Sequence, residues 1–128
     1  MRYLSDEWIK AVADDIASDS ALAGVAASYS VSVTQIVSDT PFGDVTYHLA
    51  CREGAVTFGK GSAPSDIVFS QDYQTAVDVA LGHLNAAEAF VSGKVRFTGD
   101  HEKVIAAQPF FAALDAVFTR VRARTIFN

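Results

Sequence analysis

Between residues 29 and 70, apolar and polar side chains alternate in four short segments that are separated by turn sequences. In the first segment, Val31, Val33 and Val37 alternate with small polar residues. A period of two is typical of β-strands that have one buried and one wet face. Turns are predicted at 39–44 (DTPFGD) and at Glu53-Gly54. The strands that follow the first one are therefore predicted at 44–52, 55–61 and 65–70. Short turns between consecutive strands predict an antiparallel meander.

The sequence before these strands has the three- and four-residue spacing of an amphipathic helix. Ser5 is a suitable N-cap, and acidic residues follow it in the first turn, where they suit the positive helix end. Trp8, Val12 and Ile16 then share one face, so residues 5–18 are predicted to be helical.

After the strands, Ser70 is predicted to cap a helix that ends near Gly82. The final region begins at Asp100, and Pro109 divides it into a short helix ending near 107 and a strongly apolar last helix. Helices on both sides of a set of strands favour one α+β domain over residues 1–128. We expect five strands that form a largely antiparallel sheet.

The stretch AEAFVSGKVRFTGD, at 87–100, ends one helix, adds a fifth strand and starts another helix. Gly93 offers the left-handed backbone conformation that commonly ends a helix, and Gly99 breaks the strand before Asp100 caps the next helix. The short helix before Gly93 is predicted to begin at Asn85. The stretch contains no nucleophile, metal-ligand set or phosphate loop, so its role is to connect the elements of the fold.

Charge and composition exclude several classes of function. The net charge is −5, which argues against nucleic-acid binding and against electrostatic docking to anionic membranes. Half of the residues are hydrophobic, yet no apolar run approaches the ~18 residues that would span a bilayer. Cys51 is the single cysteine, and the acidic N-terminal residues do not resemble a signal peptide. We therefore expect a cytoplasmic protein.

Residues 65–100 resemble the core signature of the sterol carrier protein family of lipid-binding domains. The resemblance lies in the apolar strand at 65–69 followed by Ser70, in Gly82-His83-Leu84, and in Ala89-Phe90, Gly93-Lys94 and Gly99-Asp100. The chain has Ala86 where members often have Pro and His83 where many have Lys, and it ends Ile126-Phe127-Asn128 rather than in a peroxisomal address.

The resemblance implies a five-stranded, largely antiparallel sheet with helices packed on one face. Between sheet and helices it implies an elongated apolar cavity that holds a sterol, fatty acid, acyl chain or phospholipid, with no cofactor and no catalytic residue. Adjacent Phe110 and Phe111 diverge by ~100° on a helix, so one of them is expected to face a ligand or a second subunit. The residues predicted to line the cavity are large and apolar: Trp8, Val12, Val33, Phe69, Val77, Leu81, Leu84, Phe90, Phe97, Phe110, Phe111, Leu114 and Phe118.

Two alternatives remain at this stage. A small enzyme acting on a hydrophobic substrate would need a buried carboxylate or histidine, and the candidates for it are Asp66, Glu88, His48, His83 and His101. The histidines lack the spacing of metal ligands, and Cys51 is expected to be an inert, half-buried thiol. A dimerising interaction module, or a homodimer, would bury Phe110, Phe111 or Phe118 between subunits.

Overall fold

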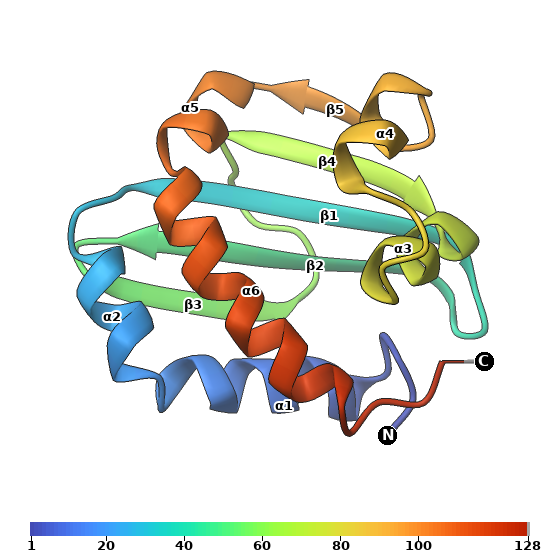
Figure 1. The fold of residues 1–128 in the computed structure, drawn as a ribbon, viewed down its shortest axis with the longest axis horizontal. Helices are drawn as coiled ribbons and strands as arrows, with labels where there is room; N and C mark the ends of the chain where they lie inside the picture. Colours follow the sequence, from blue (N-terminus) through green and yellow to red (C-terminus); the bar gives the residue numbers. More distant parts are fainter. Residues whose placement is uncertain (128) are drawn as a thin grey trace.

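The computed structural model describes residues 1–127, and the side chains of all of these except 86 and 87. Helices come first, then four strands, then helices that flank one further strand (Figure 1). The elements are α1 (Asp6–Ala17), α2 (Ser20–Ala26), β1 (Val31–Thr40), β2 (Gly43–Arg52), β3 (Ala55–Lys60), β4 (Ile67–Asp72), α3 (Tyr73–Ala80), α4 (Ala86–Val91), β5 (Arg96–Gly99), α5 (His101–Ala106) and α6 (Gln108–Arg122).

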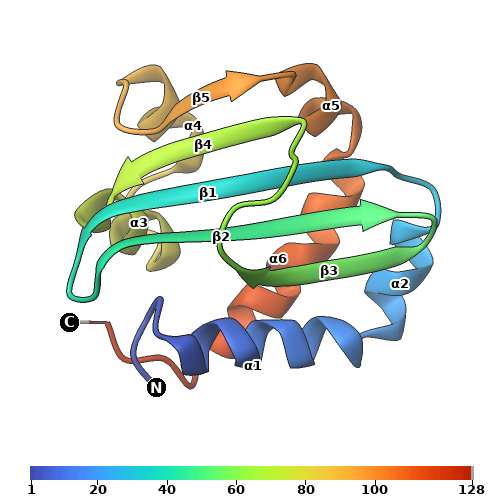
Figure 2. The same ribbon diagram turned by 180° about the vertical axis from the view of Figure 1, so that it is seen from behind.

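The five strands form one mixed sheet in the order β3-β2-β1-β4-β5. Neighbouring strands are antiparallel except β1 and β4, which run parallel. The predicted five-stranded, largely antiparallel α+β fold is therefore confirmed, but the simple meander is wrong. After β3, residues 61–66 cross the outer face of the sheet, so that β4 pairs with β1 instead of with β3 (Figure 2).

Hydrogen bonds from the outer face of β1 hold this crossing segment in place. The Thr34 hydroxyl donates to the carbonyl of Ala63 over 3.2 Å and also bonds the hydroxyl of Ser65. Ser32 and Thr34 are consequently buried although they point away from the helices. Polar side chains on the outer face of a strand are expected to contact solvent, but here residues 61–66 cover them.

The predicted helix and strand positions agree with the structure apart from two details. Helix α2 was not expected; Asp19 caps it by accepting a hydrogen bond of 2.9 Å from the N–H of Leu22. Ser70 is not a helix cap, because β4 stays paired with β1 as far as Asp72. Asp72 is the N-cap of α3 and accepts from the N–H of Thr75 over 2.8 Å.

The helices cover one face of the sheet, as Figures 1 and 2 show from opposite sides. Helix α6 crosses this face diagonally and contacts α1 and α2, while α3 lies against β1 and β4. The two chain ends lie side by side, since Arg2 and Ile126 form a parallel bridge. The most deeply buried core side chains come from several of these elements: Leu4, Val12, Leu22, Val31, Val37, Cys51, Ile67, Phe110, Val117 and Val121.

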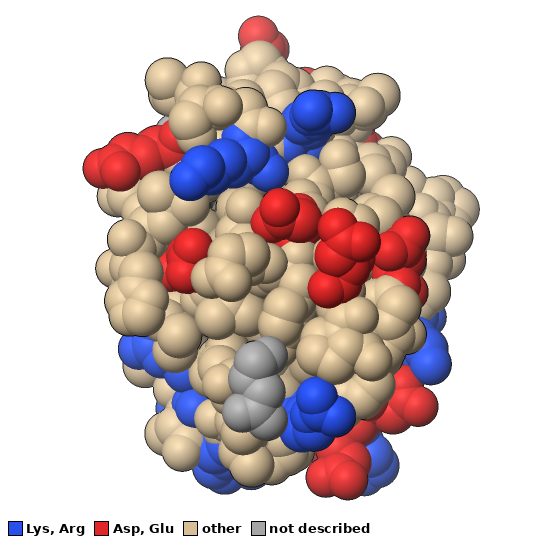
Figure 3. Space-filling model, turned by 90° about the vertical axis from the view of Figure 1, so that its right-hand side faces the viewer, with Lys and Arg blue, Asp and Glu red and all other residues tan. Residues whose placement is uncertain are grey.

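Figure 3 shows the end of the molecule that carries α3 and both termini. Acidic side chains gather across its middle, with basic ones above and below them, and no extended basic surface is seen on this face. None of the helices in residues 1–127 has the length and apolar character to cross a bilayer.

Asp66 joins the crossing segment to both β1 and α5. One carboxylate oxygen accepts from the N–H and the hydroxyl of Ser32, at 3.0 and 3.2 Å, and the other accepts from Lys103 Nζ at 3.1 Å. Partial burial disfavours the charged carboxylate, but the hydrogen bonds from Lys103 and Ser32 outweigh it and lower the pKa of Asp66.

We expect Asp66→Asn to lower the free energy of unfolding by about 1–2 kcal/mol at pH 7. A carboxyl whose pKa is lowered by folding stabilises the folded state above its unfolded pKa of about 3.9 and loses this effect as the pH falls through the folded value. The stability difference between wild type and variant in urea unfolding should therefore shrink as the pH is lowered from 7 to below about 3.9. Asp14→Asn, at an exposed ion pair with Lys10, is the control and should change stability by less than about 0.5 kcal/mol. A difference of the same size at pH 3 as at pH 7 would rule out the ionised carboxylate as its source.

Candidate functional site

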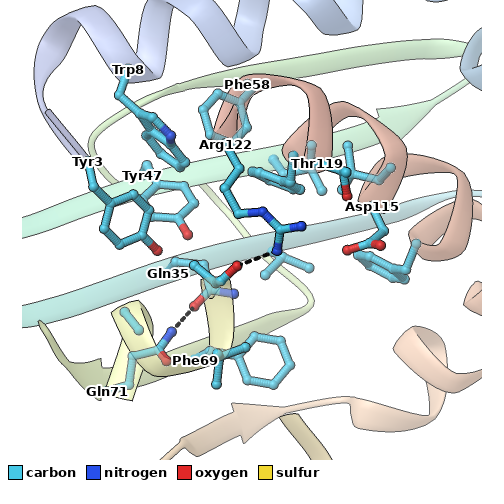
Figure 4. A pocket seen from close by; sticks show the side chains of 18 of the residues that line it. Tyr3, Trp8, Gln35, Tyr47, Phe58, Phe69, Gln71, Asp115, Thr119 and Arg122 are labelled. Carbon is cyan, nitrogen blue, oxygen red and sulfur yellow. Dashed lines mark hydrogen bonds between the residues drawn. The ribbon is translucent and has the colours of Figure 1, made fainter. Parts of the chain in front are cut away.

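A cavity of about 420 Å³ lies between the inner face of the sheet and helices α3 and α6 (Figure 4). This volume falls within the ~300–1,000 Å³ range typical of small-molecule sites. Apolar side chains form most of its wall. The lining residues are Tyr3, Trp8, Val33, Gln35, Tyr47, Leu49, Phe58, Phe69, Gln71, Ala76, Val79, Ala80, Val104, Phe111, Leu114, Asp115, Phe118, Thr119, Arg122 and Phe127.

The floor of the cavity follows from strand alternation, because every second side chain points to the same face. The strand registers bring these inward positions together across the sheet: Val33 lies opposite Leu49, and Gln35 lies between Tyr47 on β2 and Phe69 on β4. The roof is one face of α6, whose contributing residues recur at helical spacing: Phe111, Leu114, Asp115, Phe118, Thr119 and Arg122.

Aromatic rings pack together at one side of the cavity. The Trp8 ring meets Tyr47 edge-on, with centroids 5.7 Å apart, and lies nearly parallel to Phe118 at 6.1 Å. Phe58 contacts Trp8, Tyr47 and Phe118 at 5.3–6.2 Å. Such rings cover a large apolar area at fixed spacing, so they separate α1 and α6 from the sheet.

Polar groups gather in the part of the cavity shown in the centre of Figure 4. Gln71 Nε2 donates to Gln35 Oε1 over 3.2 Å, and Arg122 Nη1 donates to the carbonyl of Ala80 over 2.6 Å. Burial raises the pKa of Tyr3 and of Tyr47, so both hydroxyls stay protonated at neutral pH. The cavity is therefore apolar along its walls and hydrogen-bonding in one region.

The structure brings part of the predicted set of residues to this cavity: Trp8, Val33, Phe69, Phe111, Leu114 and Phe118. Val12 and Phe110 do not line it, because both are fully buried in the packed core. Val77 packs against that core, and Leu81 is more than one-third exposed.

The remaining predicted residues lie away from the cavity lining. Phe90 and Phe97 pack on each other, with ring centroids 4.7 Å apart, where α4 covers the β5 edge of the sheet. Leu84 follows the end of α3 and is only partly buried. The second half of the family-like segment at 65–100 thus builds the far edge of the sheet, whereas the cavity lies under α6.

Several lining residues were not predicted from the sequence. The strand alternation already placed Tyr47 and Leu49 on one side of a strand, which was a usable signal. No local pattern indicates Tyr3 and Phe127, whose rings meet at 4.8 Å because the two chain ends are bridged.

The residues suspected of catalysis lie elsewhere. Among the residues that the structure describes, the cavity lining includes no histidine, cysteine or glutamate, and no group of acidic, histidine or cysteine side chains could hold a metal ion. His48 Nδ1 bonds the carbonyl of Gly61 at 2.9 Å, and His101 lies against the ring of Phe97. The Cys51 thiol is buried and donates to backbone carbonyls, and burial raises its pKa, so it stays protonated.

Comparison with known proteins gives a family and a fold. The family model described as "SCP-2 sterol transfer family" matches residues 6–112. A crystal structure of sterol carrier protein 2 aligns with 94% of this chain and 98% of its own, at 20% identity and a TM-score of 0.66. The apo form of sterol carrier protein 2 from Yarrowia lipolytica aligns over 88% of each chain, at 18% identity and a TM-score of 0.63.

The same fold also matches part of a larger protein. A stereoselective inverting sec-alkylsulfatase from a Pseudomonas species aligns with 70% of this chain but only 14% of its own, at 23% identity and a TM-score of 0.50. No curated protein sequence is significantly similar to the chain. At these identities the solved structures show a shared fold, and the family model shows membership.

Proposed function

This chain belongs to the SCP-2 sterol transfer family, and we propose that it binds the hydrocarbon part of a lipid in the cavity beneath α6 and carries it without covalent chemistry. The ligand would be a sterol, fatty acid, acyl chain or phospholipid. The observation that supports this most directly is the 420 Å³ cavity itself, with its largely apolar wall. We further propose that the whole chain acts as a single binding domain in the cytoplasm, where the free Cys51 thiol would stay reduced.

The energy of binding would come mainly from removing hydrocarbon from water. Each methylene that enters an apolar cavity contributes about 0.8 kcal/mol, so a chain of ordinary length can bind without any charged contact. Specificity would then depend on the few polar groups of the wall, which fix the orientation of the ligand.

A non-catalytic role is supported by the chemistry of the lining. The ionised side chains there are Asp115 and Arg122, both exposed at the surface of α6, and none of the carboxylates or histidines suspected from the sequence reaches the cavity. The alignment with a segment of an alkylsulfatase favours one second candidate, in which this fold serves as an accessory domain for the hydrophobic substrate of an enzyme.

Dimerisation through the last helix is less well supported. Phe110 is fully buried within its own chain, and Phe111 and Phe118 belong to the cavity wall. These rings are therefore already occupied by contacts inside the chain.

Native mass spectrometry of freshly purified protein, together with titration by a fluorescent fatty acid, tests the proposal. We expect one bound lipid or one saturable site per chain. A chain that carries no adduct and takes up no probe would refute lipid carriage.

Filling the cavity should abolish this uptake. Val79 lines the cavity from α3, and Val79→Trp adds a large ring to space that is already empty. We therefore expect probe binding to fall by about tenfold or more, while the cost in stability stays below the ~1–3 kcal/mol of overpacking a filled core. Val91→Trp is the matched control, since Val91 is 89% exposed on α4 and should leave binding unchanged. Equal binding by both variants would place the lipid elsewhere.

A further inference from the structure

Two buried tyrosines present unused hydrogen-bond donors to the cavity. Tyr3 and Tyr47 are only 7% and 9% exposed and both line the cavity, and no hydrogen bond within residues 1–127 uses either hydroxyl. Figure 4 shows both hydroxyls directed into the cavity, towards Gln35. No fully buried side-chain oxygen of the described residues lacks a partner, so these two hydroxyls are reached from the cavity and can donate to a group bound there.

Gln35 adds a further donor at the same place. It lies directly opposite Tyr47 in the pairing of β1 with β2. Its side-chain oxygen accepts from the amide of Gln71, and Gln35 lines the cavity, so its own amide N–H groups are available as donors there.

Arg122 supplies a positive charge that forms no ion pair with a carboxylate of residues 1–127. Its Nη1 is fixed by the carbonyl of Ala80, at the end of α3, and a guanidinium has further N–H groups available for a second acceptor. Ion pairs among the described residues include Arg120, which bonds Asp15 and Asp19, but not Arg122. Figure 4 shows the Arg122 side chain extending over the cavity towards the glutamines.

Asp115 is the one lining group of opposite charge. It precedes Arg122 by seven residues on α6, which separates the two backbones by about 10 Å along the helix axis, and Thr119 lies between them. A negative ligand group would therefore be favoured near Arg122 and disfavoured at the Asp115 end.

We infer that Tyr3, Tyr47, Gln35 and Arg122 form a binding site for the carboxylate of the ligand, so that the preferred ligand is an acyl chain with a free acid group. The inference rests on the proposed function, because it assigns a binding site to the head group of the lipid whose tail would lie against the apolar wall. Four donors, one of them charged, match the acceptor-only chemistry of a carboxylate. The single hydroxyl of a sterol, or an ester, would leave most of them unpaired.

Paired ligands that differ only in the head test this. Dodecanoate and methyl dodecanoate have the same acyl chain, and the fluorescence of Trp8, the single tryptophan and a cavity residue, reports the entry of either. We expect the wild-type protein to bind the acid at least about tenfold more tightly than the ester. Arg122→Gln should weaken binding of the acid by about tenfold and leave binding of the ester within twofold. A tenfold loss is at the lower end for the removal of a charged hydrogen bond, because Arg122 is partly exposed to water.

Three further variants separate the carboxylate site from a general effect. Arg124→Gln removes the same charge from an exposed residue outside the cavity lining and should change neither affinity. Arg122→Lys should recover part of the acid binding, and Tyr47→Phe should weaken binding of the acid alone. Unchanged ester binding also shows that each variant is folded.

The possible results distinguish failure of the carboxylate site from failure of lipid binding, on which that site depends. If acid and ester bind equally in every variant, the carboxylate site is refuted and lipid binding stands. If neither ligand binds the wild type, the carboxylate site is refuted, and lipid carriage is refuted as well only if native mass spectrometry also finds no bound lipid.

Discussion

Gly99→Ala is expected to destabilise the protein by about 3–5 kcal/mol, a large part of the ~5–15 kcal/mol that holds a typical domain folded. Gly99 ends β5 with φ at +119°, a region that side chains rarely adopt. An added Cβ would lie 2.3 Å from the carbonyl oxygen of Asp66 and 2.9 Å from the Cα of Ile67. Both are backbone atoms, so the clash can be relieved only by separating β5 from β4.

The hydrogen bond next to Gly99 limits this relief. Asp100 N–H donates to the same Asp66 carbonyl over 2.9 Å, which holds the end of β5 against the start of β4. Moving the strands apart would therefore break this bond and disturb the N-cap that Asp100 provides for α5.

Gly24→Ala is the matched control for this substitution. Gly24 lies inside α2, and an added Cβ would meet no atom within 4 Å. Alanine should raise the free energy of unfolding there by about 0.5–1 kcal/mol, because glycine is a poor helix former. Urea unfolding of both variants measures the contrast. A Gly99→Ala protein within 1 kcal/mol of wild type would mean that the β4–β5 edge is not an essential part of the fold.

Gly99 also shows which part of the fold the sequence predicts well. Its role as the end of a strand, and that of Asp100 as a helix cap, follow from local chemistry alone, and the structure confirms both. The parallel pairing of β1 with β4 was not predictable in this way. It depends on residues 61–66 crossing the sheet, and strand alternation indicates which face a residue takes but not which strand lies beside it.

The residues of the candidate site were likewise predictable only where a local sequence pattern indicates them. The periodic apolar pattern identified part of the wall, such as Trp8 and Phe118, because a buried helical stripe is a local signal. Gln35 occupies an inward position of the same alternation, but a lone polar residue in a strand is not by itself a sign of a cavity. Tyr3 reaches the cavity only because the start of the chain is paired with residue 126, over a sequence distance that no periodicity covers.

The cavity has a physical origin in the shape and chemistry of its lining. Trp8, Phe58 and Phe118 are rigid rings whose mutual contacts fix the distance between α6 and the sheet. The side chains beneath that span, such as Gln35 and Gln71, bond each other and cannot fill it with hydrocarbon. A space held open by rings and lined partly by amides resists the collapse that would close a purely aliphatic gap.

Phe110→Ala should destabilise the protein far more than Phe111→Ala, although the two residues are neighbours on α6. Phe110 is fully buried in the core, so its removal leaves a cavity that the packed surroundings cannot fill, and the free energy of unfolding should fall by about 3–5 kcal/mol. Phe111 faces the existing cavity and is only partly buried, so its loss should cost less than half as much.

The two variants should also differ in how ligand affinity depends on acyl-chain length. Phe111→Ala enlarges the cavity and removes apolar wall, so short acyl chains should bind more weakly while longer or bulkier ones lose less or gain. Phe110→Ala should keep the wild-type order of chain lengths, measured by Trp8 fluorescence at temperatures where the variant is folded. If Phe110→Ala changed that order and Phe111→Ala did not, the ligand would contact the opposite side of α6, and the cavity beneath it would not be the binding site.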